Sequence, residues 1–182
     1  MDPLELTRTI HIAINVVVFI QIVGAVLTFT PMRERRRGFG SLYVVGFVVV
    51  LGGASRADLW LPAAIPGLVG LVAAAALFLW ARIAIHGKMF SYILSTDVPQ
   101  FACMNGPYRW IRHPFYASYM LTLLSVTLMF PSYVTAGGFI LAIVSFNYVA
   151  NFEEGKFKDS PVAAEYEAYK RRTGRFLPGL QH

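Results

Sequence analysis

The side chains best suited to chemistry lie in one short stretch, residues 105–119, between two apolar segments. Gly106 precedes a proline there, which predicts a turn. The pair His113-Pro114 predicts a helix start, because proline suits the first helical position and pushes the preceding residue out of the α region. In a helix that begins at Pro114, His113 and Tyr116 are three residues apart and face the same way.

Arg109, Arg112 and His113 lie beside this predicted helix N-terminus. Together they form an electropositive mouth at a membrane edge, which suits an anionic or zwitterionic small molecule. Arginines and aromatic residues that flank a membrane segment are also ordinary interfacial anchors, so a binding role needs further support.

A second polar group lies near the end of the last apolar segment. Asn147, Asn151 and Glu154 follow the helical spacing i, i+4 and i+7, and Glu153 adjoins them. The two carboxylates are compatible with simple solvation at the end of a span. Asn147 lies deeper, however, where a polar side chain needs a partner, and this favours a substrate or cofactor site.

The composition is that of a polytopic membrane protein. Of 182 residues, 56% are hydrophobic and only 14% are charged. The net charge of +6 does not indicate nucleic-acid binding, because the basic residues cluster beside apolar segments. The single cysteine, Cys103, allows no internal disulfide. Asp2 and Glu5 precede the first apolar run, so we expect that run to be a span and not a signal peptide.

We predict an all-α bundle of about five transmembrane helices in one domain, with three spans in residues 1–88 and a cofactor-binding half in 89–182. The predicted spans are residues 10–30, 42–54, 68–85, 115–130 and 133–150. Fourteen of the sixteen lysines and arginines fall in the segments that this topology places in the cytoplasm. By the positive-inside rule, the N-terminus is outside and the C-terminus is cytoplasmic.

Short polar joints complete the predicted fold. Pro131-Ser132 predicts a tight antiparallel hairpin between the last two spans. After Ser160-Pro161, a plausible cap and first turn, we predict an amphipathic cytoplasmic helix that carries Tyr166 and Tyr169 and ends near Gly174.

These residues carry a family likeness. The chain resembles the isoprenylcysteine carboxyl methyltransferase family and its phospholipid methyltransferase relatives, which are integral-membrane enzymes that use S-adenosylmethionine. The resemblance covers roughly residues 90–178. Three blocks carry it in order: Gly106-Pro107-Tyr108 with Arg112-His113-Pro114-Phe115-Tyr116, then Glu153-Glu154, then Tyr166 and Tyr169 with Arg175-Phe176-Leu177-Pro178.

The resemblance implies a cofactor site between the last two spans and the C-terminal segment. A lipophilic substrate would enter it sideways from the bilayer. The implied cofactor-binding residues are Tyr108, His113, Pro114, Tyr116 and Glu154, with Glu153 as a further candidate and with backbone contacts from Gln100, Ala102 and Cys103.

The chain departs from the family pattern at two positions. Ser118 replaces a small glycine after the motif tyrosine, and Ala150 stands where the prenylcysteine enzymes carry an arginine that engages the substrate carboxylate. The phospholipid-type relatives share the glutamate pair without needing that arginine. The acceptor is therefore either a prenylcysteine-like carboxylate or a phospholipid-like amine.

Methyl transfer from a sulfonium is an in-line displacement, for which a protein mainly supplies alignment and a dry site. An amine acceptor needs a proton acceptor, and Glu153 and His113 are the candidates. A carboxylate acceptor needs a cation, and Arg109 and Arg112 are the candidates.

Two other classes remain open at this stage. Membrane sterol reductases, which use NADPH, have a similar C-terminal pattern but are much longer. A non-catalytic membrane protein would use the same polar residues only for anchoring and packing. A metal site is not predicted, because the four histidines show no ligand spacing with cysteines or carboxylates.

Overall fold

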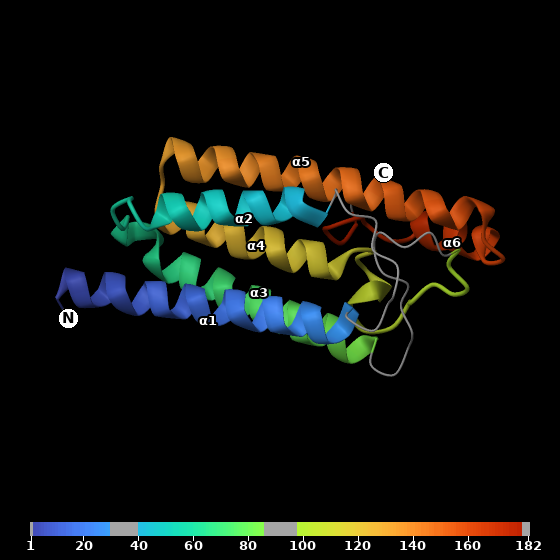
Figure 1. Cartoon of the computed structure of the whole chain (residues 1–182). Coiled ribbons are helices and arrows are strands. Elements are labelled where there is room, and N and C mark those ends of the chain that lie inside the picture. The colour runs from blue at the N-terminus through green and yellow to red at the C-terminus, as the bar shows by residue number, and fades with distance from the viewer. Residues whose placement is uncertain (1, 30–39, 86–97, 180–182) are drawn as a thin grey trace.

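The computed structural model describes residues 2–29, 40–85 and 98–179 (Figure 1). The basic cluster at positions 33–37, and with it much of the charge on which the predicted orientation depends, lies outside the described residues. Most of the connection predicted between the third span and residue 104 also lies outside them, including His86 and Lys88.

The described chain is helical. Five apolar helices occupy the predicted span positions, and a short sixth helix follows them. Their bounds are α1 Pro3–Phe29, α2 Gly40–Ala54, α3 Ala64–Ala84, α4 Pro114–Met129, α5 Tyr133–Lys156 and α6 Ala163–Lys170. Three short 3-10 helices join them: η1 Leu61–Ala63, η2 Gly106–Arg109 and η3 Phe157–Asp159. The predicted all-α class is confirmed.

Three segments of the described chain are long and apolar enough to cross a membrane: Leu4–Ala25, Leu61–Ala84 and Tyr133–Asp159. The apolar parts of the other two helices are shorter, Val44–Ala54 and Pro114–Met129, whereas a full crossing takes about 20 residues. The structure thus supports an integral membrane protein with at least three candidate spans, and the count of five spans stays a prediction.

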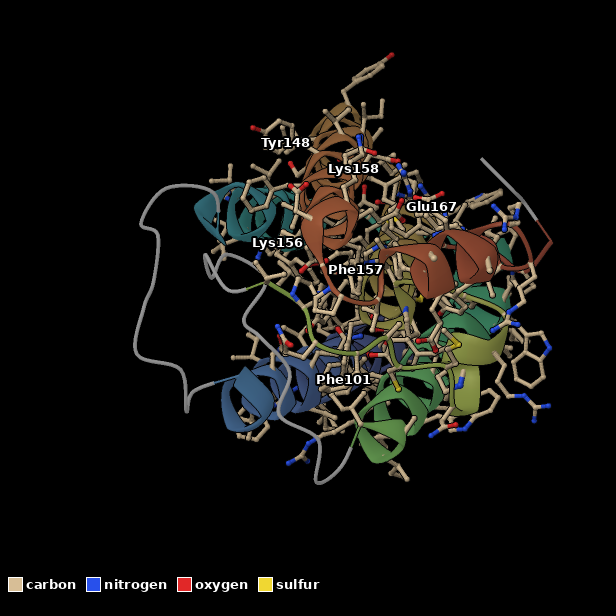
Figure 2. All side chains as sticks on the ribbon, turned by 90° about the vertical axis from the view of Figure 1, so that its right-hand side faces the viewer. Phe101, Tyr148, Lys156, Phe157, Lys158 and Glu167 are labelled. Atoms are coloured by element: carbon tan, nitrogen blue, oxygen red, sulfur yellow. The ribbon has the colours of Figure 1, made fainter. Side chains whose placement is uncertain are left out.

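The helices pack into one bundle. α3 packs against α1 and α4, and α2 packs against α5. The N-terminus lies at one end of the bundle, and α6 lies at the other (Figure 1). Figure 2 views the α6 end, which carries Lys156, Lys158 and Glu167.

Apolar side chains cover both the inside and the outside of this bundle. Leu71, Leu123 and Phe146 are buried in the core, whereas Ile65 and Ile140 are exposed. Exposed apolar faces on helices whose polar backbone groups are satisfied within each helix suit contact with lipid.

Gly106 permits the close packing of η2 against the end of α3. A Cβ atom at Gly106 would lie 2.7 Å from the Ala84 Cβ, and the φ angle of Gly106 is +57°. Only glycine fits this position without strain, because L-residues avoid positive φ and because the space is closed. Gly106 therefore lets η2, and the residues after it, lie against the end of α3.

Several predicted helix ends are confirmed. His113 is the N-cap of α4, and Pro114 is its first residue. The hairpin between α4 and α5 turns at Ser132, whose side chain forms a reciprocal capping box with Thr135. α5 continues to Lys156, so that Asn147, Asn151 and both glutamates lie on one helix.

Other boundaries differ from the predictions. The third span was expected to begin at residue 68, but α3 begins at Ala64. Pro66 lies in its first turn, where backbone N–H groups have no partner within the helix and proline is tolerated. Ser160 was expected to cap the last helix. Its hydroxyl instead donates to the Phe157 carbonyl at 2.8 Å, and α6 begins at Ala163. α6 ends at Lys170, before the predicted end near Gly174.

Candidate active site

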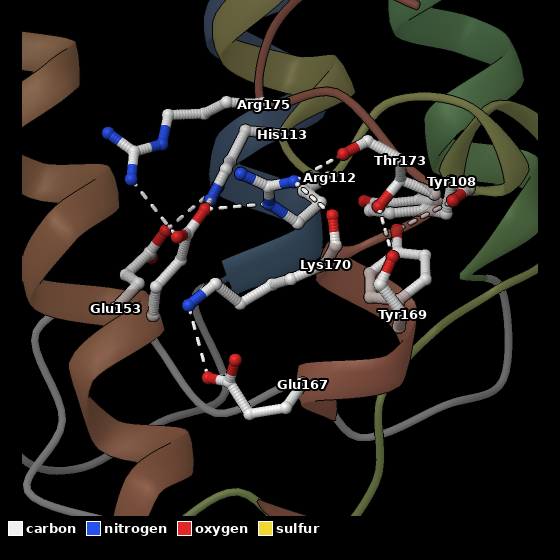
Figure 3. A network of polar contacts seen from close by, with 10 residues as sticks. Tyr108, Arg112, His113, Glu153, Glu167, Tyr169, Lys170, Thr173 and Arg175 are labelled. Carbon is white, nitrogen blue, oxygen red and sulfur yellow. Dashed lines mark hydrogen bonds and ion pairs between the residues drawn. The ribbon is translucent and has the colours of Figure 1, made fainter. Parts of the chain in front are cut away.

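The carboxylate of Glu154 is the centre of a polar network at the end of α5. Figure 3 shows this network, with its partners Arg112, His113 and Arg175 labelled. Its Oε1 accepts hydrogen bonds from Arg112 Nε at 2.9 Å and from His113 Nε2 at 3.1 Å. Its Oε2 accepts a hydrogen bond from Arg175 Nη2 at 3.1 Å. Glu154 lies in the last turn of α5 and is buried, so that these charge-assisted bonds act in a largely water-free place.

His113 lies between two carboxylates. Its Nδ1 is 3.3 Å from Glu153 Oε2, and its Nε2 is 3.1 Å from Glu154 Oε1. Burial lowers the pKa of the imidazole, but hydrogen bonds to Glu153 and Glu154 outweigh burial, and the pKa is raised above its ordinary value. Both ring nitrogens can donate only in the imidazolium form, so the geometry holds His113 as a cation.

The ring of His113 is also fixed by stacking and by its place in the chain. It lies parallel to the Tyr116 ring, with centroids 5.3 Å apart and an interplanar angle of 5°. The predicted common face of these two residues is confirmed. The Phe176 ring is tilted against the His113 ring, with centroids 6.0 Å apart. Position 113 is the N-cap of α4, so the helix start sets where the imidazole lies.

Arg112 connects the network to the C-terminal segment of residues 160–178, which we call the tail segment. Its side chain is fully buried. Its Nη1 donates to the backbone carbonyls of Lys170, at 3.2 Å, and of Thr173. Arg112 therefore joins α5, through Glu154, to the last residue of α6 and to Thr173 beyond it.

Backbone bonds hold the tail segment to the stretch before α4. Arg112 N–H donates to the Gly174 carbonyl at 2.9 Å, and Gly174 N–H donates to the Trp110 carbonyl at 3.0 Å. His113 N–H donates to the Arg175 carbonyl at 3.0 Å. These bonds surround a parallel bridge between Ile111 and Gly174, and they place the side chain of Arg175 beside Glu154.

Two buried tyrosines complete this junction. The Tyr169 hydroxyl donates to the Tyr108 carbonyl at 2.6 Å. Burial raises the pKa of both phenols, with nearby Cys103 contributing to each, so both stay protonated at neutral pH. Tyr169 is thus a permanent hydrogen-bond donor that fixes α6 to η2.

The structure gathers the central part of the predicted site. Arg112, His113, Glu153 and Glu154 lie in one network, and the ring of Tyr116 stacks on His113. Pro114 and Tyr108, which are close to Arg112 and His113 in the sequence, are both buried.

Other predicted site residues lie elsewhere. Arg109 is exposed, with its guanidinium 5.7 Å from the centre of the Trp110 ring. Asn151 is exposed, and the Asn147 amide donates within its own helix to the Ile143 carbonyl at 3.0 Å.

The predicted contact segment of Gln100, Ala102 and Cys103 lies partly at the surface and partly in the core. Gln100 is exposed and donates to the Val98 carbonyl at 3.0 Å, and Ala102 is half-buried. Cys103 is buried in a cluster with Phe78 and Ala81. Its thiol donates to the Ala84 carbonyl at 3.9 Å, at the end of α3.

Arg175 had no predicted role of its own, although the structure makes it one of the three cationic partners of Glu154. The available signal was its place in the third block of the family resemblance. The contacts of Arg112 with backbone carbonyls of the tail segment had no signal, because every residue type carries a carbonyl.

The described chain is helical, has apolar helices of membrane length, and carries a charged network at one end of α5. These features are those of an integral membrane protein with a polar site near the membrane surface. Residues 68–155 match the isoprenylcysteine carboxyl methyltransferase (ICMT) family, which confirms the predicted resemblance and implies membrane methyltransferase activity. No curated protein matches the chain.

The matched range differs from the predicted one. It begins at residue 68, within α3, whereas the resemblance was expected to begin near residue 90. It ends at residue 155, directly after Glu154. The tail segment, including Arg175, lies outside the match, and it is tied to the matched part by the contacts described above.

Proposed function

We propose that this protein transfers a methyl group from S-adenosylmethionine to a lipophilic acceptor that enters from the bilayer. The observation that carries the proposal is the network at Glu154. It brings together residues from all three blocks of the family resemblance, which are far apart in the sequence.

The residues present fit the cofactor. S-adenosylmethionine has a zwitterionic amino-acid part, a sulfonium and an adenosine group. The network offers both carboxylates and guanidinium groups for the zwitterion, and the rings of Tyr116 and Phe176 lie next to it. In this proposal Tyr108, Pro114 and the segment of Gln100, Ala102 and Cys103 form further walls of the cofactor site.

When bound, the cofactor supplies an activated methyl group, and the chain's own residues align, shield and hold protons. Glu153 is the better candidate for accepting a proton from an amine acceptor. His113 already faces carboxylates with both ring nitrogens, whereas Glu153 is half-buried at the edge of the network. We assign His113 to orienting the carboxylates.

The acceptor is either a phospholipid-like amine or a prenylcysteine-like carboxylate. Ala150 is completely buried and supplies no cation where the prenylcysteine enzymes have an arginine, which favours the amine. Asn147, Asn151 and Arg109 are the candidate contacts for the acceptor's polar head. The positive-inside pattern supports a cytoplasmic cofactor site with the N-terminus outside.

Calorimetric titration of the protein in mild detergent tests this proposal. We expect saturable binding of S-adenosylhomocysteine and none of NADPH, followed by incorporation of labelled methyl groups into an amine or carboxylate lipid. Binding of NADPH alone would identify a reductase instead. Binding of neither ligand, by protein with an intact thermal unfolding transition, would support a non-catalytic role.

A further inference from the structure

Two guanidinium groups in the Glu154 network each keep a buried hydrogen-bond donor that has no partner among the described residues. Within residues 2–29, 40–85 and 98–179, Arg112 Nη2 and Arg175 Nε have no hydrogen-bond partner. A buried donor without a partner is costly, and more so when it is charged. Two such donors in one network indicate that a further acceptor belongs there.

The charges of the network favour an anionic acceptor. Arg112, Arg175 and the His113 imidazolium face two carboxylates, those of Glu153 and Glu154. One positive charge is therefore in excess. The Arg112 side chain is 0% exposed and that of Arg175 is 18% exposed, so water compensates this charge poorly.

The remaining N–H groups also suit a carboxylate. Arg112 uses Nε for Glu154 and Nη1 for two backbone carbonyls, which leaves both hydrogens of Nη2. Guanidinium donors match the two oxygens of a carboxylate. Figure 3 shows the guanidinium groups of Arg112 and Arg175 on either side of the His113 side chain. Both groups bind the same carboxylate, that of Glu154.

We propose that Arg112 Nη2 and Arg175 Nε bind a carboxylate group of a ligand, so that the tail segment supplies part of the ligand site. The inference rests on the proposed function, which provides two sources of a carboxylate. One is the amino-acid part of the cofactor, and the other is a carboxylate acceptor. Arg175 and the tail segment lie outside the residues that match the family.

The test compares S-adenosylhomocysteine with its decarboxylated analogue, by calorimetry, on the wild-type protein, Arg175→Gln and Arg175→Lys. If the cofactor supplies the carboxylate, Arg175→Gln weakens binding of S-adenosylhomocysteine about ten- to a hundredfold and leaves binding of the analogue unchanged. Arg175→Lys keeps the charge but loses Nε as a donor, and we expect an intermediate loss.

The second arm of the test measures the KM of each variant for a prenylcysteine acceptor. If the acceptor supplies the carboxylate, cofactor affinity is unchanged in Arg175→Gln, and the KM for a prenylcysteine acceptor rises at least tenfold. Arg171→Gln is the matched control, because Arg171 is an exposed arginine directly after α6. Thermal unfolding of each ligand-free variant shows whether the tail segment stays folded.

Three outcomes are decisive. A selective loss in either arm supports the carboxylate site. Equal effects of Arg175→Gln on S-adenosylhomocysteine and its analogue, or no effect in both arms, overturn the inference but leave the methyltransferase proposal standing. If the wild-type protein binds no S-adenosylhomocysteine, both proposals fail.

Discussion

Two sets of polar side chains on the same two helices satisfy their hydrogen bonds in opposite ways. In the interior of α4 and α5, neutral side chains bond to carbonyl groups three or four residues earlier on their own helix, at 2.7 to 3.1 Å; these are Ser118, Thr122, Ser125, Ser145 and Asn147. At the α6 end, Glu154 binds partners that are 42, 41 and 21 positions away.

The difference follows from charge. A neutral hydroxyl or amide in an apolar helix can donate to a carbonyl of its own helix and needs no counter-charge. A buried carboxylate needs counter-charges, which its own helix does not offer at this position. The charged network therefore depends on docking of the tail segment, and the interior bonds do not. Function that uses the network should be lost when a single charge is removed.

Glu154→Gln should have the largest effect of any substitution we consider. It leaves the buried cations Arg112 and His113 without a central counter-charge, and breaking a buried ion pair costs about 3 to 5 kcal/mol. We expect a fall in the thermal unfolding temperature and at least a hundredfold loss of S-adenosylhomocysteine affinity, measured by calorimetry. Glu165→Gln, at an exposed position of α6, should change neither. A Glu154→Gln protein with wild-type stability and affinity would show that the network is not the site.

The raised pKa of His113 predicts a smaller, pH-dependent effect. A group whose pKa is higher in the folded state than in the unfolded state stabilises the fold fully below its unfolded pKa, about 6.5. That contribution is lost as the pH rises through the folded pKa. The unfolding temperature should therefore decline above about pH 6.5. His113→Gln should be less stable at low pH and should lack this part of the decline. Parallel pH profiles of the two proteins would contradict the imidazolium assignment.

The sequence predicted the parts of the site that local rules control. The helix start at Pro114, the stacking partners His113 and Tyr116, and the glutamates at the end of α5 all follow from spacing and from proline stereochemistry. The role of Arg175 did not, because its contact with Glu154 depends on a backbone bridge at Gly174 that no side-chain pattern encodes. The start of α3 was predicted too late, at residue 68 instead of Ala64, because a proline in the first turn of a helix, such as Pro66, resembles a proline in a loop.

Gln21 of α1 bonds to the interior set, and its substitution should have the smallest effect of those considered. It is 1% exposed, and its Nε2 donates to Thr122 Oγ1 at 2.9 Å and to the Ser118 carbonyl at 3.4 Å. Its Oε1 has no partner within the described parts of the chain. Gln21→Leu removes a bond worth about 0.6 kcal/mol between membrane helices, and it also removes the unsatisfied oxygen.

These two effects oppose each other, so we expect the stability of Gln21→Leu to change by less than about 1 kcal/mol. Affinity for S-adenosylhomocysteine should stay within about twofold of the wild-type value, since no charge of the network is altered. Thermal unfolding and calorimetry on the same preparation measure both. A loss of affinity close to that of Glu154→Gln would mean that the interior set supports the site after all, and the division between local and long-range polar groups would then be wrong.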